Sequence, residues 1–442
     1  IVQLLDGVRG KRVVVLVGPG NNGGDGMVAA RYLADWGALI TLYMTSSRRR
    51  EDKFEECRSR QVRVVEAADD PEQMQLASYV PLADLVVDAV LGIGAGDARP
   101  LDGSIGAALT AVGGVQRRQP ALRVVAIDLP TGLNADSGAC DDACIGAAIT
   151  LTLGAPKIGL FRFPGARLAG RIEPIGIGLP DGIDGGLAID LADDASVSAA
   201  LPARRIDAHK GSHGHLLVVA GSRNFVGAPV LTATAAYRTG AGLVTLAAPE
   251  TVYRIAAMGL LEQVHLPLPE TESGNLGPAA VGATRTALEA ATAAVVGPGL
   301  GSEESVRLFL ESLLLSDPDS RAANPAPATP TVLDADALNV LAVTYRWWKR
   351  MRAPAVLTPH PGEMARLTGR AISDVQDLRI ETASEAARTW GQVVVLKGAL
   401  TVVASPDGRV TISPFSNPAL ATAGTGDVLA GIIGALMAQG AG

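Results

Sequence analysis

Residues 18–26 read GPGNNGGDG and decide how the first half of the chain folds. An apolar run at 12–17 precedes them, and the sequence MVAARYLADWG, which has the pattern of a helix, follows them. Gly18, Gly20 and Gly23 have the spacing G-x-G-x-x-G of loops that bind dinucleotides between a strand and a helix. This segment therefore predicts a strand, a glycine-rich loop and a helix, which is the opening of a parallel α/β fold.

The residues around this loop do not fit an NAD-dependent dehydrogenase. Asp25 follows the third glycine by two positions, and its carboxylate would repel the pyrophosphate that a dinucleotide loop binds. The next predicted strand ends in residues 44–48, MTSSR, which contain no acidic residue for a ribose hydroxyl. We therefore expect a chemistry without hydride transfer at this loop.

The composition limits the classes of protein to consider. A length of 442 residues predicts two or three domains, and 48% hydrophobic but only 4% aromatic residues predict aliphatic cores. The net charge of −7 argues against nucleic-acid binding, and no run approaches the roughly 18 apolar residues of a membrane helix. Three cysteines predict a reducing, cytoplasmic setting, and Cys140 and Cys144, four apart, have no second pair for zinc.

Apolar, β-branched runs alternate with alanine-rich helical stretches along the chain. This alternation predicts parallel sheets covered by helices on both faces, in two α/β domains. The pattern breaks near 195–211, so we place the domains at 1–198 and 199–442. Strands are expected in the first domain at 12–17, 39–44, 61–66, 84–90, 122–128 and 147–153. In the second they are expected at 215–220, 243–247, 293–296, 331–334, 355–358, 392–397, 400–404 and 410–412, with an exposed loop at 316–330.

Carboxylates follow three of the predicted strands of the first domain. Asp25, Asp88 and Asp128 each lie near a strand end, and Asn21 and Asn22 precede Asp25 in the glycine loop. Ligands of open α/β sheets bind outside the carboxyl ends of the strands, where these side chains gather. Their oxygens suit a hard cation or a polyhydroxyl ligand. The alternative for each residue alone is a helix cap or a turn, but three at successive strand ends favour a site.

Three segments of the first half together resemble the YjeF N-terminal domain, the NAD(P)HX epimerase family. They are GPGNNGGDGMVAARYLADWG (18–37), VVDAVLGIG (86–94) and AIDLPTGLNADSG (126–138), and the resemblance covers roughly residues 1–180. It implies a Rossmann-like three-layer α/β/α sandwich that binds a hydrated nicotinamide dinucleotide. Family members more often have Ser at position 131, and Thr131 keeps the hydroxyl.

The same resemblance implies the residues of this site. A potassium ion would be held by Asn22, Asp88 and Thr131, and Asp128 would bind substrate and move a proton as acid or base. The dinucleotide would contact Asn21, Asn22, Gly23, Gly24, Asp25, Gly92, Ile93, Gly94, Ala95, Gly96, Asp97, Ala98 and Asp128.

The second half has no P-loop, G-x-x-x-x-G-K-[ST], but carries another candidate anion site. Residues 422–427, TAGTGD, precede an apolar helix expected at 428–438. Backbone N–H groups at a helix start stabilise phosphate charge, and Asp427 can take a proton from an attacking hydroxyl. The alternative is that Asp427 is an ordinary N-cap. The segments LKGALT (396–401) and TPHPGE (358–363) also lie at predicted strand ends and favour a site.

Six segments of the second half resemble the YjeF C-terminal family, the ADP/ATP-dependent NAD(P)HX dehydratases of the ribokinase-like superfamily. They are HKGSHGHLLVVAGS (209–222), VGAPVLTATAAYRTGAGLVTLA (226–247), VVGPGLG (295–301), LDADALN (333–339), LTPHPGEMARL (357–367) and NPALATAGTGDVLAG (417–431). The resemblance implies that the hydrated dinucleotide contacts Ala228, Gly299, His360 and the catalytic Asp427. It implies that Lys397, Gly398, Ala399, Leu400, Thr401 and Gly426 bind ADP or ATP, with Mg²⁺ bridging the phosphates.

The two resemblances together imply a bifunctional repair enzyme for NAD(P)H hydrates, with an epimerase and a dehydratase domain. We expect a homo-oligomer whose ligands are NAD(P)HX and ADP or ATP, and no nucleic-acid or membrane partner. Two alternatives stay open: a ribokinase-like vitamin kinase with an accessory Rossmann-like domain, and a binding or scaffold module. Because the chain starts without Met and stops at Gly442, soon after the 428–438 helix, we expect natural residues beyond both ends.

Overall fold

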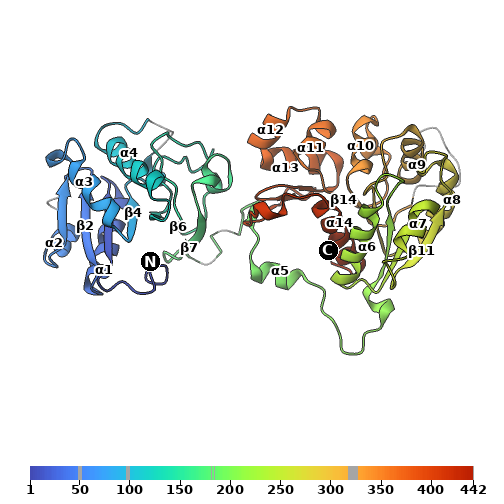
Figure 1. Cartoon of the computed structure of the whole chain (residues 1–442), viewed down its shortest axis with the longest axis horizontal. Coiled ribbons are helices and arrows are strands. Elements are labelled where there is room, and N and C mark those ends of the chain that lie inside the picture. The colour runs from blue at the N-terminus through green and yellow to red at the C-terminus, as the bar shows by residue number, and fades with distance from the viewer. Residues whose placement is uncertain (48–51, 96–99, 181, 184, 317–326, 442) are drawn as a thin grey trace. The chain divides into compact units, whose positions relative to one another are not determined.

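The computed structural model describes residues 1–47, 52–95, 100–180, 182–183, 185–316 and 327–441. The chain divides into two compact units, Ile1–Gly185 and Gly186–Gly442, each with its own sheet (Figure 1). Each unit is described by itself below.

The first unit is built on a parallel sheet. Within the described residues it has seven strands in the order β3-β2-β1-β4-β5-β6-β7, and every neighbouring pair is parallel. The strands are β1 Arg12–Val17, β2 Leu39–Met44, β3 Arg63–Glu66, β4 Leu85–Ala89, β5 Arg123–Ile127, β6 Ile149–Leu153 and β7 Arg171–Ile175. The helices are α1 Asn21–Asp35, α2 Asp52–Arg58, α3 Met74–Tyr79 and α4 Gly103–Arg118.

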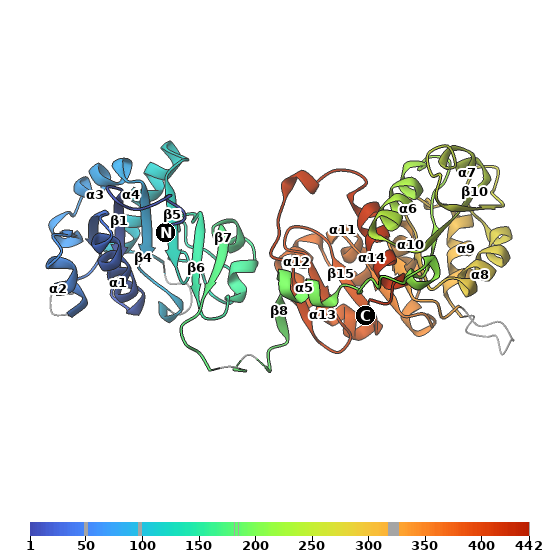
Figure 2. The same cartoon turned by 90° about the horizontal axis from the view of Figure 1, so that it is seen from below.

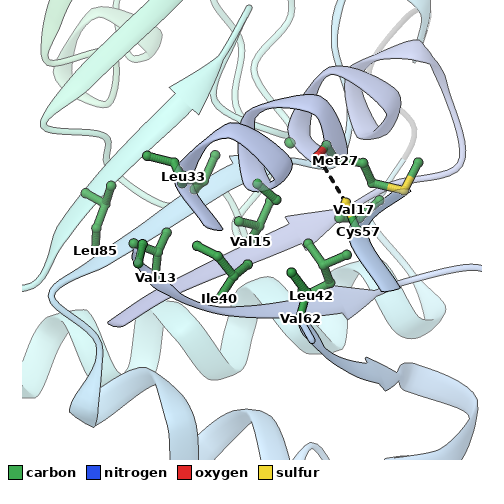
Figure 3. Packing of buried hydrophobic residues seen from close by; sticks show 14 of the residues in the cluster. Val13, Val15, Val17, Met27, Leu33, Ile40, Leu42, Cys57, Val62 and Leu85 are labelled. Carbon is green, nitrogen blue, oxygen red and sulfur yellow. Dashed lines mark hydrogen bonds between the residues drawn. The ribbon is translucent and has the colours of Figure 1, made fainter. Parts of the chain in front are cut away.

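Strand β1 is buried on both faces, and its alternating side chains enter two separate cores. Val13, Val15 and Val17 pack with residues of α1 and α2, and Figure 3 shows these three valines with Met27 and Leu33. Val14 and Leu16 point to the other face and pack with residues of α3 and α4. The period of two along a strand therefore converts one continuous apolar run into a three-layer α/β/α sandwich.

The second unit has a larger mixed sheet. Within the described residues its order is β11-β10-β9-β12-β13-β14-β15-β16-β17-β8, with β15, β16 and β17 antiparallel and the other neighbours parallel. The strands are β8 Ile189–Leu191, β9 His215–Val219, β10 Leu243–Pro249, β11 Val264–Leu268, β12 Ala293–Val296, β13 Thr331–Leu333, β14 Ala355–Leu357, β15 Val393–Leu396, β16 Val402–Ala404 and β17 Val410–Ile412.

Helices α6 and α14 lie side by side over the centre of this sheet, as Figures 1 and 2 both show. A Cβ on Gly431 of α14 would lie 2.3 Å from the carbonyl oxygen of Thr232 in α6, so glycine permits this close approach. The helices are α5 Asp194–Ala200, α6 Gly227–Thr239, α7 Glu250–Ala256, α8 Val281–Ala290, α9 Glu304–Leu314, α10 Asp336–Val343, α11 Pro361–Thr368, α12 Ile372–Asp377, α13 Arg379–Trp390 and α14 Thr425–Ala438.

Every strand that the sequence predicts is present within a few residues, and three strands were not predicted. These are β7, β8 and β11, and each lies at an edge of its sheet. Edge strands are not buried on both faces, so they lack a continuous apolar run, and two of them contain proline, Pro174 in β7 and Pro267 in β11.

The division between the units comes earlier than the predicted boundary between 198 and 199. Strand β8 pairs with β17, which draws residues from Gly186 onward into the second unit. The predicted boundary falls inside helix α5, because the sequence break near 195–211 marks a poorly buried segment of the second unit. Most of the predicted loop at 316–330 lies outside the described residues. Among the described residues, no helix combines the length and apolar character needed to cross a membrane.

We predict that Leu42→Ala destabilises the first unit by about 2–5 kcal/mol, because Leu42 is fully buried in the core between the sheet and α1. Leu39→Ala on the same strand is the matched control, since Leu39 is 58% exposed, and it should change stability by less than about 0.5 kcal/mol. Denaturant unfolding followed by circular dichroism measures both. Equal effects of the two substitutions would contradict this packing.

Candidate functional sites

In the first unit, the segments that follow β1, β4, β5 and β6 meet at one edge of the sheet because these strands are parallel neighbours. The glycine segment differs from the sequence expectation of a loop through residue 26. Helix α1 begins at Asn21, with Gly20 as its N-cap, so Asn21–Asp25 form its first turns. A Cβ on Gly18 would lie 1.9 Å from the Val90 carbonyl oxygen, so this glycine lets the chain pass close to the end of β4.

Asp88 and Thr131 form a buried pair at the ends of β4 and β5. The Thr131 hydroxyl donates to Asp88 Oδ1 at 2.6 Å, and the Thr131 backbone N–H donates to Asp88 Oδ2 at 2.8 Å. Both residues are fully buried. Burial raises the pKa of Asp88, while the two hydrogen bonds from Thr131 oppose that rise. The pair presents carboxylate and hydroxyl oxygens in the interior of the unit.

Asn22 is the one predicted cation ligand whose side chain has no partner among the described residues. It is 7% exposed, and neither Oδ1 nor Nδ2 makes a hydrogen bond. A Cβ on Gly92 would lie 3.6 Å from Asn22 Cγ and 2.9 Å from Asp128 Oδ2, so both side chains lie against this glycine. An unpaired buried amide costs about 1–3 kcal/mol, which a ligand would recover.

Asp128 forms a largely buried ion pair with a lysine that the sequence interpretation did not select. Lys157 Nζ donates to Asp128 Oδ1 at 2.5 Å and also to the Leu153 carbonyl oxygen at 2.7 Å. Asp128 has φ of +69°, a left-handed conformation that is rare for residues other than glycine and occurs often at active sites. The Ile93 backbone N–H donates to Asp128 Oδ2 at 3.3 Å, which joins the Gly92 loop to this carboxylate.

The other predicted dinucleotide contacts surround this pair or lie outside the described residues. Gly23 and Gly24 are buried in the first turns of α1, Asp25 is half-buried and Asn21 is exposed. Ile93–Ala95 form a short 3-10 helix, with Ile93 and Gly94 exposed. Gly96, Asp97 and Ala98 lie outside the described residues.

In the second unit, Asp334 and Lys397 form the corresponding buried ion pair. Lys397 Nζ donates to Asp334 Oδ1 at 2.7 Å, and the Thr358 hydroxyl donates to the same oxygen at 2.7 Å. Asp334 follows β13 and Lys397 follows β15, so the strand ends again bring the charges together. Glu363 Oε2 lies 3.9 Å from Lys397 Nζ. A single lysine therefore faces two buried carboxylates.

His360 caps helix α11 and lies beside the same lysine. Its Nδ1 accepts from the backbone N–H of Gly362 at 3.0 Å, and the backbone N–H of His360 donates to Glu363 Oε2 at 2.7 Å. Burial, together with the positive charges of Lys397 and Arg366, lowers the pKa of His360. Burial raises the pKa of Glu363 to about 6. The lowered pKa keeps His360 neutral near neutral pH, so it can act as a hydrogen-bonding group, whereas Glu363 is still mostly ionised there.

Asp427 lies in the first turn of α14, beside the lysine pair. The helix begins at Thr425 with Gly424, at φ +90°, as N-cap, so Asp427 is inside the helix and the N-cap alternative is wrong. Burial raises the pKa of Asp427, and the Asp334 carboxylate adds to the rise. A Cβ on Gly426 would lie 3.4 Å from Lys397 Nζ, which places the start of α14 against that ammonium.

The predicted nucleotide-binding segment is the turn between β15 and β16. Gly398 and Ala399 are exposed, whereas the Leu400 side chain is buried. The buried Arg379 side chain holds this turn, because its Nη2 donates to the carbonyl oxygens of Leu396 at 2.9 Å and Lys397 at 3.2 Å. Burial lowers the pKa of Arg379 to about 10.

Two further predicted residues lie together at the start of α6. A Cβ on Gly299, which has φ of +64°, would lie 3.0 Å from the Cβ of Ala228. The Ser222 hydroxyl donates to the Gly299 carbonyl oxygen at 2.8 Å and holds this turn. A side chain at position 299 would be strained by the positive φ and would crowd Ala228. Glycine therefore lets the segment 297–301 approach α6 closely.

The interpretation of the sequence missed Lys157 and Arg379. Lys157 follows strand β6, so the rule that selected Asp128 from the end of β5 could have selected it as well. Arg379 lies at the start of helix α13, where nothing in the local sequence separates it from a surface arginine. Only its burial and its two carbonyl contacts identify it.

Two α/β units, each with a buried carboxylate–lysine pair at the strand ends, define a two-domain α/β enzyme. Family models match both units: YjeF-related protein N-terminus over residues 1–159 and NAD(P)H-hydrate dehydratase over residues 216–441. The chain belongs to the family of bifunctional NAD(P)H-hydrate repair enzymes.

Relatives match almost the full chain. The bifunctional NAD(P)H-hydrate repair enzyme Nnr of Moorella thermoacetica is 40% identical over 444 residues, which are 98% of this chain and 80% of that protein. The enzyme of the same name from Salinibacter ruber is 40% identical, over 97% of this chain and 79% of that protein. The ADP/ATP-dependent NAD(P)H-hydrate dehydratase of Bacillus subtilis, co-crystallised with ATP/Mg²⁺, is 33% identical; the match covers 57% of this chain and 83% of that one, with a TM-score of 0.47.

We predict that Lys157→Met lowers the free energy of unfolding of the first unit by about 3 kcal/mol, because it leaves the buried Asp128 carboxylate without its counter-charge. Lys11→Met is the matched control, since the Lys11–Asp84 pair is exposed and should contribute less than about 1 kcal/mol. Denaturant unfolding at neutral pH measures both variants. A cost for Lys157→Met no greater than that of the control would show that the pair is not buried as described.

Proposed function

We propose that the first unit interconverts the R and S hydrates of NAD(P)H and that the second unit converts the S hydrate to NAD(P)H with ADP or ATP. The observation that carries this proposal is a separate buried carboxylate–lysine pair in each unit, in a chain whose bifunctional relatives match both units. The epimerase supplies the epimer that the dehydratase uses, so the two reactions together repair both forms of the damaged cofactor.

In the first unit, Asp128 is the proposed acid/base and Lys157 its positioning partner. Inverting the hydrated carbon requires a bond at that centre to break and re-form, and a carboxylate held in place can take and return the proton. The ion pair with Lys157 and the N–H of Ile93 fix both carboxylate oxygens in one orientation. The first turns of α1, with Asn21–Asp25, and the segment 92–98 contact the dinucleotide in this proposal.

The residues Asn22, Asp88 and Thr131 fit a potassium ion. They supply amide, carboxylate and hydroxyl oxygens, which hard cations prefer, and the unpartnered Asn22 side chain is the observation that favours a ligand here. A bound cation would supply fixed positive charge near the anionic substrate. Asp88 would offset that charge, and Thr131 would orient Asp88 through its two hydrogen bonds.

In the second unit, Asp427 is the proposed base. It takes the proton of the hydrate hydroxyl while the hydroxyl oxygen attacks the terminal phosphorus, and the nucleotide leaves with one phosphate fewer. Phosphate then leaves the carbon, a proton is lost from the neighbouring position, and the double bond of NAD(P)H re-forms. The N–H groups at the start of α14 stabilise the charge on the transferring phosphoryl group.

The nucleotide is proposed to lie against the turn 397–401 and Gly426. Lys397 already faces Asp334 and the start of α14, so its ammonium is placed to neutralise phosphate charge. Mg²⁺ bound with the nucleotide would supply positive charge that offsets the charge of the phosphates. Ala228, Gly299 and His360 are proposed to contact the hydrated dinucleotide. Homo-oligomer formation and a cytoplasmic location stay predictions from the sequence.

The direct test supplies the full chain with purified R and S epimers of hydrated NADPH, ATP or ADP, and Mg²⁺. We expect recovery of the reduced-nicotinamide absorbance from both epimers, with release of free phosphate. No recovery from the pure S epimer would contradict the dehydratase, and recovery limited to the S fraction, after correction for spontaneous epimerisation, would contradict the epimerase. A stable phosphorylated alcohol would instead identify the kinase alternative.

Two variants separate the sites within the same chain. Asp427→Asn should lower the dehydratase rate by about 10²–10⁴-fold and leave epimerisation unchanged, because it removes only the proposed base of the second unit. Asp128→Asn should have the reverse effect. Epimerisation is followed by chromatography of the two epimers and dehydration by absorbance. Loss of both activities in either variant would contradict the assignment of one reaction to each unit.

The cation site has a test that needs no activity. KCl should raise the unfolding temperature of the first unit relative to tetramethylammonium chloride at equal ionic strength, because ligands stabilise the state that binds them. Asn22→Ala should fold normally, since it removes two unpaired buried polar groups, and should lose this response. An equal potassium response in the variant would remove Asn22 from the site.

A further inference from the structure

All three cysteines of the chain, Cys57, Cys140 and Cys144, lie in the first unit, and the second unit has none. Each is a free thiol, but their surroundings differ. Cys57 is fully buried and donates to the Met27 carbonyl oxygen at 3.2 Å (Figure 3), whereas Cys140 and Cys144 are partly exposed. The mechanism proposed above uses none of them.

Cys140 and Cys144 lie on the two sides of one tight turn. Cys140 forms an antiparallel bridge with Leu133, and the Cys144 N–H donates to the Asp141 carbonyl oxygen at 3.0 Å. Asp141 holds the turn, since its carboxylate accepts from the backbone N–H groups of Leu101 and Ala143. The Cys140 thiol donates to the Gly138 carbonyl oxygen at 3.5 Å, and the two thiols are close enough for each to shift the pKa of the other. The fold thus places both thiols in one turn, four positions apart.

This turn packs against the proposed cation site. Gly132 follows Thr131 directly and has φ of +93°, and a Cβ on it would lie 3.5 Å from the Cβ of Cys144. Its carbonyl oxygen accepts from the Asp141 N–H at 3.0 Å. A movement of Cys144 or Asp141 therefore acts on the backbone next to Thr131, whose N–H and hydroxyl hold the Asp88 carboxylate.

We propose that Cys140 and Cys144 are a reversible oxidation site, at which peroxide forms a disulfide that lowers the activity of the first unit. Sulfur atoms in a disulfide lie about 2.05 Å apart, closer than in any hydrogen bond, so the turn must contract when the bond forms. The contraction displaces the backbone at Gly132 and the Thr131–Asp88 pair. The effect on catalysis rests on the proposed epimerase function, whereas formation of the disulfide does not.

The oxidation balances with peroxide as the oxidant. The Cys140 thiol loses its proton and the thiolate attacks one peroxide oxygen; the O–O bond breaks, Cys140 becomes a sulfenic acid, and the hydroxide that leaves takes up that proton to give one water. The Cys144 sulfur then attacks the Cys140 sulfur, the S–O bond breaks, and a second water leaves with the Cys144 proton. Two thiols lose two electrons in total, and one peroxide becomes two waters. A dithiol reverses the step by thiol–disulfide exchange.

The order of attack follows from the surroundings of the three thiols. The neighbouring Cys144 thiol lowers the pKa of Cys140, which favours Cys140 as the sulfur that reacts first. Burial raises the pKa of Cys57 to about 11, so Cys57 should stay reduced. Cys57 is thus an internal control for the oxidation, and the cysteine-free second unit is an internal control for activity.

The test treats the full chain with a small excess of hydrogen peroxide, alkylates the remaining thiols and maps the cysteines by mass spectrometry. We expect a Cys140–Cys144 disulfide with Cys57 alkylated, and a fall in epimerase activity of about tenfold, since small displacements in a site carry costs of this size. Dehydratase activity should not change, and dithiothreitol should restore epimerisation. Cys140→Ser and Cys144→Ser should each keep the activity of the reduced chain and resist peroxide.

Each other outcome contradicts a defined part of the proposal. Oxidation of the two cysteines to separate sulfinic acids, or disulfides only between chains, would overturn the site. A disulfide with unchanged epimerisation would overturn its effect on activity, as would equal inhibition of the serine variants. If the reduced chain has no epimerase activity, the proposed function of the first unit fails, and the mass spectra still decide whether the disulfide forms.

Discussion

The parallel pairing of β1 with both β2 and β4 is the constraint on which the first unit depends. Because β1 is buried on both faces, helices must cover both sides of the sheet, and every connection must return the chain to the same starting edge. The carboxyl ends of all the described strands of this unit then lie on the same side of the sheet. Residues far apart in the sequence, from Asn22 to Lys157, meet there for this reason.

Both units have a carboxylate–lysine pair at the carboxyl ends of their parallel strands. Each unit has a largely buried ion pair, Asp128 with Lys157 and Asp334 with Lys397. In each pair, the attraction between the two charges offsets the free-energy cost of removing them from water. The surrounding groups differ in a way that separates their chemistry. Asn22 leaves unpaired polar atoms beside Asp128, which favours a cation, whereas the glycine-led start of α14 lies beside Lys397, which favours phosphate.

The positions of the interior strands could be predicted because burial on both faces leaves continuous apolar runs such as residues 12–17, whereas the order of the strands within each sheet comes from the structure. The edge strand β3 was also predicted, but the edge strands β7, β8 and β11 were not, since their side chains are mostly exposed or half-buried and form no such run. Among site residues, acids at strand ends were found by position, but Lys157 and Arg379 were not. Their partners lie 29 and 17–18 positions away in the sequence, so only folding reveals these contacts.

The sequence by itself determined two α/β domains, their glycine-rich turns and the carboxylates at the strand ends, because strand burial, turn conformation and strand polarity leave local patterns. Its motifs also indicated the family. Only the tertiary structure decided that Asn22 is buried without a partner among the described residues, that Lys157 holds Asp128, and that Cys144 lies against Gly132, next to Thr131. Burial and pairing depend on which segments the sheet brings together, and no local pattern carries that information.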